Sequence, residues 1–143
     1  MKVLTYLRAD LNIIRANTGD FPLYIAMRDK QITVVEELLA RGADINIVTI
    51  NGCVALHLAV ELGNINIVKN ILEKGANINV RNNDGVTPLN NEASNNNKEM
   101  VEFLLNNGAD SNIPDINGIY PWHGASFLGF LEVMQLLFLK LLT

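Results

Sequence analysis

The chain has 143 residues, a net charge of -4 and 49% apolar residues, which predicts one globular domain with a sizeable core. Its basic residues are not concentrated in any segment, and this argues against nucleic acid or an anionic membrane as a partner. The single cysteine, Cys53, excludes an internal disulfide and is typical of a reducing compartment.

The start of the chain does not have the pattern of a secretory signal, because Arg8 and Asp10 end the apolar stretch too early. We therefore expect a cytoplasmic protein, and one that acts in the host cytoplasm if its source is an intracellular microbe or a virus.

Four pairs of short helices are predicted in chain order, each a first helix followed closely by an amphipathic second helix. The first helices of the pairs are expected at Pro22–Asp29, Ala55–Leu62, Pro88–Asn95 and Pro121–Leu128. The second helices are expected at Ile32–Arg41, Ile65–Lys74, Lys98–Asn107 and Leu131–Leu141.

The third pair shows the local signals most clearly. Asn82 to Gly85 has the composition of a tight turn, because Asp-Gly tolerates positive φ values. Thr87 suits the N-cap of the next helix, and Pro88 suits its first position, where a missing N–H costs nothing. Gly108 then suits a helix end in the left-handed region.

These signals recur at a spacing of 33 residues along the chain. The spacing joins Pro22, Ala55, Pro88 and Pro121, then Gly42, Gly75 and Gly108, and then Asn46, Asn79 and Asn112. A repeat of this length is too small to bury its own apolar face. The period therefore predicts that neighbouring repeats stack into one array.

The period and the recurring words "VALHLA", "EELLARGADIN" and "KNILEKGANIN" resemble the ankyrin repeat. The resemblance implies an all-α solenoid of stacked helix-turn-helix units with β-hairpin loops. It further implies a single domain, residues 1–143, with a capping turn at residues 1–17. The four repeats would span about residues 18–50, 51–83, 84–116 and 117–143.

No constellation of catalytic or metal-binding residues is evident. His57 and His123 occupy the histidine position of the repeat, where the resemblance implies a structural role in tying neighbouring turns together. They lie two repeats apart, and Cys53 has no obvious base or second ligand at a fixed offset. We expect no enzymatic activity, no cofactor and no metal.

Glu92 departs most from the repeat, because the equivalent positions are Ala26, Ala59 and Ala125. A carboxylate at a buried position carries a desolvation cost unless it is paired or protonated. We expect a local distortion that lets Glu92 reach solvent, with a role in binding a partner or an ion as the alternative. Together with Asn90, Asn91 and Asn96, this residue predicts that the third repeat is the weakest.

The resemblance implies that a partner protein docks on the concave face, formed by the hairpin tips and the ends of the inner helices. Apolar residues at these positions increase toward the C-terminal end, as expected of an interface centre. The predicted contact residues are Ile50, Asn51, Leu62, Asp84, Val86, Ile116, Ile119, Phe127 and Leu128.

The final helix is apolar on the side that a terminal repeat normally turns to water. Either the natural chain continues beyond Thr143, or another copy covers this side. A self-associating surface, most simply that of a homodimer, would contain Leu136, Leu139, Leu141 and Leu142.

The sequence therefore predicts a non-enzymatic protein-protein interaction module. The alternative is an assembly element that dimerises through its C-terminal helix. The partner is expected to be another protein, and neither a nucleic acid nor a membrane.

Overall fold

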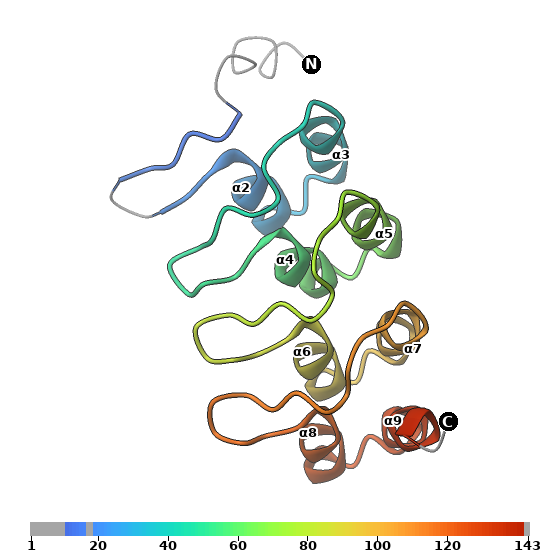
Figure 1. Cartoon of the computed structure of the whole chain (residues 1–143). Helices are drawn as coiled ribbons and strands as arrows, with labels where there is room; N and C mark the ends of the chain where they lie inside the picture. The colour runs from blue at the N-terminus through green and yellow to red at the C-terminus, as the bar shows by residue number, and fades with distance from the viewer. Residues whose placement is uncertain (1–10, 17–18, 142–143) are drawn as a thin grey trace. The chain divides into compact units, whose positions relative to one another are not determined.

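The computed structural model describes residues 11–16 and 19–141, which form eight α-helices and contain no β-strand (Figure 1). The helices form four pairs in chain order, each pair being one repeat. Repeat 1 contains α2 (Pro22–Arg28) and α3 (Ile32–Ala40), and repeat 2 contains α4 (Ala55–Leu62) and α5 (Ile65–Glu73). Repeat 3 contains α6 (Pro88–Ser94) and α7 (Lys98–Asn106), and repeat 4 contains α8 (Pro121–Leu128) and α9 (Leu131–Leu141).

The predicted all-α repeat fold is confirmed. Each helix begins at the expected residue and ends within one residue of the expected end. The chain divides into two compact units, and each is described by itself: unit 1 is Met1–Ala76 and unit 2 is Asn77–Thr143. In unit 1, α2 and α5 each pack against both α3 and α4. In unit 2, α6 and α9 each pack against both α7 and α8.

Apolar residues at helical spacing form the core of each unit. The buried apolar side chains of the unit 1 helices include Leu23, Val35, Leu38, Leu39, Leu56, Val60, Ile67 and Ile71. Those of the unit 2 helices include Leu89, Ala93, Met100, Val101, Leu104, Ala125, Val133 and Leu137.

The loops that join the repeats are closed by short turns and contain no strand ladder among the described residues. In the loop before α6, the N–H of Gly85 donates to the Asn82 carbonyl at 2.9 Å, and the N–H of Asn82 donates to the Val86 carbonyl at 3.1 Å. Gly85 has a φ of +73°, as its place in this turn requires. The described residues of this loop form a turn and no strand, so the strands of the expected β-hairpin are absent from it.

Glu92 does not reach solvent, so the expected local distortion is wrong. Its side chain is 2% exposed. Oε1 accepts a hydrogen bond from Asn91 Nδ2 at 3.0 Å, and Oε2 accepts one from Asn97 Nδ2 at 2.9 Å. Asn91, a poor helix former expected to weaken this repeat, and Asn97, the N-cap of α7, therefore supply the donors that a buried carboxylate needs.

The turns between the two helices of a repeat contain a residue in the left-handed region. In repeats 2 and 4 this residue is a glycine, Gly63 with φ +80° or Gly129 with φ +76°. Lys30 in repeat 1 and Asn96 in repeat 3 have a φ of 56° at the same place. A side chain carries a steric cost there, and the cost is smaller for asparagine than for lysine.

Candidate interaction surfaces

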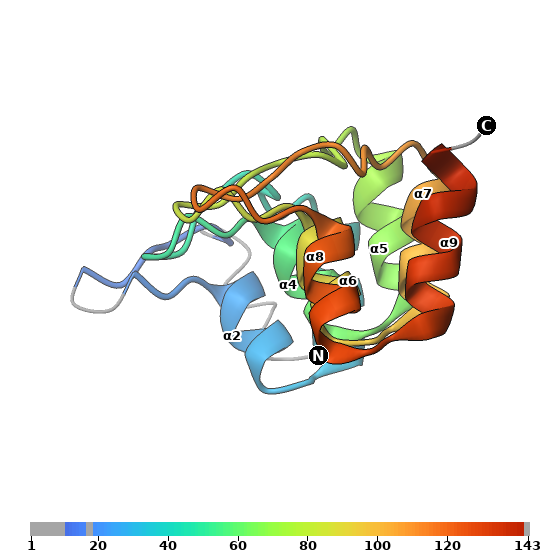
Figure 2. The ribbon, with the colours of Figure 1, turned by 90° about the horizontal axis from the view of Figure 1, so that it is seen from below.

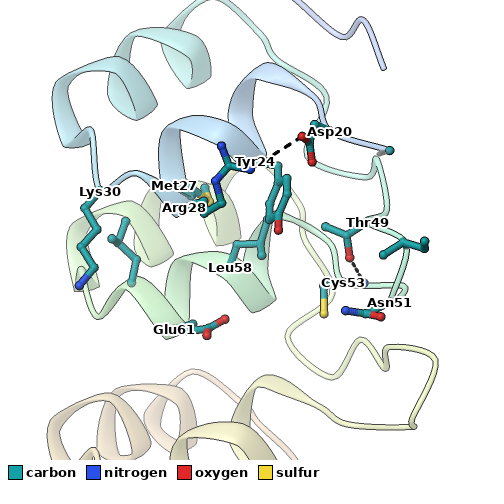
Figure 3. A pocket seen from close by; sticks show the side chains of 13 residues that line it. Asp20, Tyr24, Met27, Arg28, Lys30, Thr49, Asn51, Cys53, Leu58 and Glu61 are labelled. Atoms are coloured by element: carbon teal, nitrogen blue, oxygen red, sulfur yellow. Dashed lines mark hydrogen bonds and ion pairs between the residues drawn. The ribbon is translucent and has the colours of Figure 1, made fainter. Parts of the chain in front are cut away.

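Unit 1 contains a cavity of about 320 Å³ between α2, α4 and the loop at residues 49–53 (Figure 3). Met27, Leu58 and Leu62 contribute apolar surface to its lining, while Ile50 stands at its edge and is 81% exposed. The complete lining consists of Gly19, Asp20, Tyr24, Met27, Arg28, Lys30, Thr49, Ile50, Asn51, Cys53, Leu58, Glu61 and Leu62. Its volume is at the lower end of the range for ligand sites and fits one large side chain.

Tyr24, Met27 and Arg28 of α2 line one part of this cavity. The guanidinium carbon of Arg28 lies 5.7 Å from the centroid of the Tyr24 ring, a distance typical of a cation–π contact. Arg28 also pairs with Asp29 at 3.2 Å and with Asp20 at 3.8 Å. The hydrogen bond and charge of Asp29 raise the pKa of Arg28 above its ordinary value.

The opposite side of the cavity is formed by the loop and the end of α4. Thr49 Oγ1 accepts a hydrogen bond from the N–H of Cys53 at 3.2 Å, which fixes the loop. Asn51, Glu61 and Lys30, which follows α2, are exposed residues of the lining (Figure 3). The cavity therefore combines an apolar lining with charged and amide groups that a polypeptide could reach.

Three of the predicted contact residues, Ile50, Asn51 and Leu62, line this cavity. Sequence reasoning missed the contribution of Tyr24. The 33-residue spacing could have identified it, because Tyr24 stands at the position that His57 occupies in repeat 2.

Unit 2 exposes large apolar side chains at the end of α8 and in the loop before it. Phe127 and Leu128, at the end of α8, are 90% and 51% exposed. Ile116 and Ile119, in the loop before α8, are 64% and 43% exposed. We call these four residues the unit 2 patch.

The other two predicted residues of unit 2 lie in the neighbouring loop. Asp84 is exposed, and its carbonyl accepts a hydrogen bond from the N–H of Ile116 at 2.9 Å. Arg81 adds a second link, because its guanidinium donates to the Pro114 carbonyl at 2.8 Å. Val86 is half-buried. The two loops of unit 2 are therefore held together, which positions Ile116 without help from a ligand.

The predicted self-association residues are only partly brought together. Leu136 is half-buried and Leu139 is 64% exposed, and both line a groove of about 250 Å³ between α7 and α9. The groove is also lined by Glu102, Leu105, Asn106 and Lys140. The side chain of Leu141 and the whole of Leu142 lie outside the described residues.

Both histidines form the hydrogen bonds of a structural residue. His57 Nδ1 accepts from the N–H of Val54 at 3.2 Å, and His123 Nδ1 accepts from the N–H of Tyr120 at 3.0 Å. Val54 and Tyr120 stand where repeat 3 has Thr87, and the bond to the backbone N–H still forms without the threonine. No group of three potential metal-ligating side chains was found in the described part of the chain. Within that part, no helix is both long and apolar enough to cross a membrane.

Comparison with known families gives one match. The family model described as ankyrin repeats (3 copies) matches residues 1–82 and 56–141, which together cover nearly the whole chain. No curated protein matches the chain.

Proposed function

Because this chain belongs to the ankyrin-repeat family, whose members generally bind other proteins, we propose that it is a non-enzymatic module that binds a partner protein. The observation that carries this proposal is the exposure of Phe127, which is 90% accessible at the end of a well-formed helix. An aromatic side chain of this size costs free energy in water and stabilises a complex when a partner covers it.

The two units offer the partner different kinds of contact. The unit 2 patch protrudes, so Phe127 would insert into an apolar depression on the partner. The unit 1 cavity is hollow, so it would accept a side chain of the partner, with Ile50, Asn51 and Leu62 around it. Aromatic anchors and the pockets that receive them account for most of the binding free energy of protein interfaces.

The chemistry of the described residues supports binding over catalysis. Nδ1 of each histidine is occupied by a backbone N–H, and Arg28 is held by two carboxylates. These groups fix structure and are not arranged around a nucleophile. The proposal therefore includes no cofactor, no metal, no nucleic acid and no membrane, and it places the protein in the cytoplasm.

A second candidate function is self-association through α9, with Leu136, Leu139, Leu141 and Leu142 as the proposed contacts. The observation that favours it is the 64% exposure of Leu139 beside the α7–α9 groove. Self-association predicts that the isolated protein has a mass greater than that of one chain. Binding of another protein predicts a complex only when that partner is present.

Photo-crosslinking tests the first candidate. A photoreactive phenylalanine analogue would replace Phe127 in one protein and Glu99, an exposed residue of α7, in a matched control. We expect the probe at position 127 to join the protein to a distinct partner in a lysate of its source cells, and the probe at position 99 to give background only. Equal patterns from both positions would contradict a partner contact at Phe127.

A further inference from the structure

Each repeat that is followed by another within its unit has an apolar face that the next repeat covers. In unit 1, Leu23 of α2 is 1% exposed and Leu39 of α3 is 0% exposed. In unit 2, the equivalent Leu89 of α6 is 1% exposed and Leu105 of α7 is 4% exposed. In both units the next helix pair packs against these helices, with α2 contacting α4 and α6 contacting α8.

In repeat 4 the equivalent face is not covered by a further helix pair among the described residues. Trp122 and Phe138 stand 33 residues after Leu89 and Leu105. Phe138 is 42% exposed and Trp122 is half-buried, and their ring centroids lie 6.4 Å apart. Leu131, which takes the place of Lys98 in repeat 3, is 65% exposed. Met134, half-buried, adds a fourth apolar residue.

We call Trp122, Leu131, Met134 and Phe138 the end face. Figure 2 looks toward α8 and α9, and no other helix of unit 2 lies in front of them. A terminal repeat normally has polar residues on this face, because it meets water. The end face instead contains two aromatic rings, one leucine, one methionine and no charged side chain.

His123 places a hydrogen-bond donor at the position that Asn90 occupies in repeat 3. Asn90 Nδ2 donates to the Ile119 carbonyl of the next loop at 3.1 Å, which ties repeat 3 to repeat 4. His123 stands 33 residues after Asn90. Because its Nδ1 accepts the Tyr120 N–H, the ring proton resides on Nε2. That N–H makes no hydrogen bond within the described residues, so it remains available to an acceptor on a covering chain.

We propose that the end face is covered by the end face of a second copy of this chain, in a twofold dimer. Within unit 2 the structure that covers such a face is a helix pair, and the second copy supplies one in α8 and α9. A twofold pairing covers both faces at once and closes, whereas head-to-tail stacking leaves an open face at each end. None of the four side chains that define the end face is charged, so these side chains do not repel an identical copy.

The area available is sufficient for such a dimer. The exposed parts of the four side chains amount to roughly 300 Å² per chain, on the scale of areas for large apolar side chains. Since somewhat over half of an interface is apolar, a pair of end faces with its polar rim would bury about 1,000 Å². This is the size that separates specific interfaces from chance contacts.

Sedimentation velocity of the full chain between about 1 and 100 μM tests the proposal. We expect the wild-type mass to rise from the 15.8 kDa of one chain toward twice that value. The double variant Leu131→Lys, Phe138→Glu should remain monomeric over this range. Leu139 lies in the α7–α9 groove of the second candidate, so Leu139→Lys separates the two surfaces: it should dimerise like the wild type if the end face is the contact, and remain monomeric if the groove is. Raising the salt concentration should not dissociate the dimer, because its contacts are apolar.

A wild-type chain that stays monomeric at 100 μM would overturn the proposal, as would open-ended oligomers or dissociation by Leu139→Lys alone. If the double variant does not fold, nuclear Overhauser contacts in mixed labelled and unlabelled wild-type protein decide the matter. Contacts between chains at the Trp122 indole support the end face, and contacts between chains elsewhere exclude it. Phe127→Ala should lose the partner and keep the dimer, so failure of the two proposals is distinguishable.

Discussion

The side-chain amide of Asn97 donates a 2.9 Å hydrogen bond to the buried carboxylate of Glu92, five residues earlier in the chain. The same asparagine caps α7, because its Oδ1 accepts the N–H of Met100 at 3.2 Å. Asn97 therefore joins α7 to α6 through Glu92, the residue that stands where the other repeats have alanine.

Asn97→Ala should destabilise the protein by about 2–3 kcal/mol, the sum of a lost cap and a lost hydrogen bond to a buried carboxyl group. Asn64 is the matched control, because it caps α5 in the same way, with Ile67 N–H donating to Oδ1 at 3.0 Å. Asn64→Ala should cost only about 1 kcal/mol. Urea unfolding of both variants measures the difference, and equal losses would show that the bond to Glu92 contributes nothing.

Glu92→Ala should also destabilise, by about 1–3 kcal/mol, because it leaves the amides of Asn91 and Asn97 without their acceptor. An unpaired carboxylate at an alanine position would give the opposite result, because its replacement by alanine would stabilise the protein. A rise in the unfolding midpoint of Glu92→Ala would show that desolvation of the carboxylate outweighs its hydrogen bonds.

The turn residues with positive φ predict two stabilising substitutions. Lys30→Gly should stabilise by about 1 kcal/mol, because lysine is strained at a φ of 56°. Asn96→Gly should give a smaller gain, because asparagine tolerates this region. Thermal unfolding of the two variants gives the order, and a larger gain at Asn96 would contradict this account of the strain.

Gly85 and Gly118 occupy equivalent turns but have different surroundings. A Cβ on Gly85 would lie 2.7 Å from the Arg81 guanidinium and 2.9 Å from the Ile116 backbone nitrogen, whereas nothing lies within 4 Å of one on Gly118. Both have positive φ values, so Gly118→Ala isolates the backbone strain, at about 1–2 kcal/mol. Gly85→Ala should cost clearly more, and similar unfolding midpoints would exclude the close approach of the two loops.

Lys98 and Glu132 form an exposed ion pair of 2.9 Å between α7 and α9. The hydrogen bond from Lys98 and the positive charge of Lys98 lower the pKa of Glu132. The same hydrogen bond and the negative charge of Glu132 raise the pKa of Lys98. The stabilisation by Glu132 is therefore lost as the pH falls through its depressed pKa, and that by Lys98 is lost as the pH rises through its raised pKa. In Lys98→Met, NMR titration should show a higher pKa for Glu132; an unchanged pKa would show that the pair does not form in solution.

Much of the fold could be predicted because the 33-residue spacing repeats each start and stop signal. Pro88, for example, marks the beginning of α6, as Pro121 marks that of α8. The burial of Glu92 could not be predicted, because it depends on where the amides of Asn91 and Asn97 point after packing. The unit 1 cavity could not be predicted from the sequence either, because it depends on how α2, α4 and the loop at residues 49–53 pack together.

The α9 surface shows a similar limit. Alignment of the second helices indicates that Leu136 and Leu139 face away from the core, but it does not show the groove against α7 in which Leu136 is half-buried. That groove depends on the packing of two helices and on the length of their side chains.

The affinity of the captured partner for Phe127→Ala, measured by titration calorimetry, tests the central claim most directly. If Phe127 is the anchor of a protein interface, this variant should bind at least about 30-fold more weakly, which corresponds to about 2 kcal/mol. The control Asn117→Ala changes an exposed residue of the neighbouring loop and should bind within about twofold of the wild type. Equal affinities of Phe127→Ala and the wild type would contradict the account.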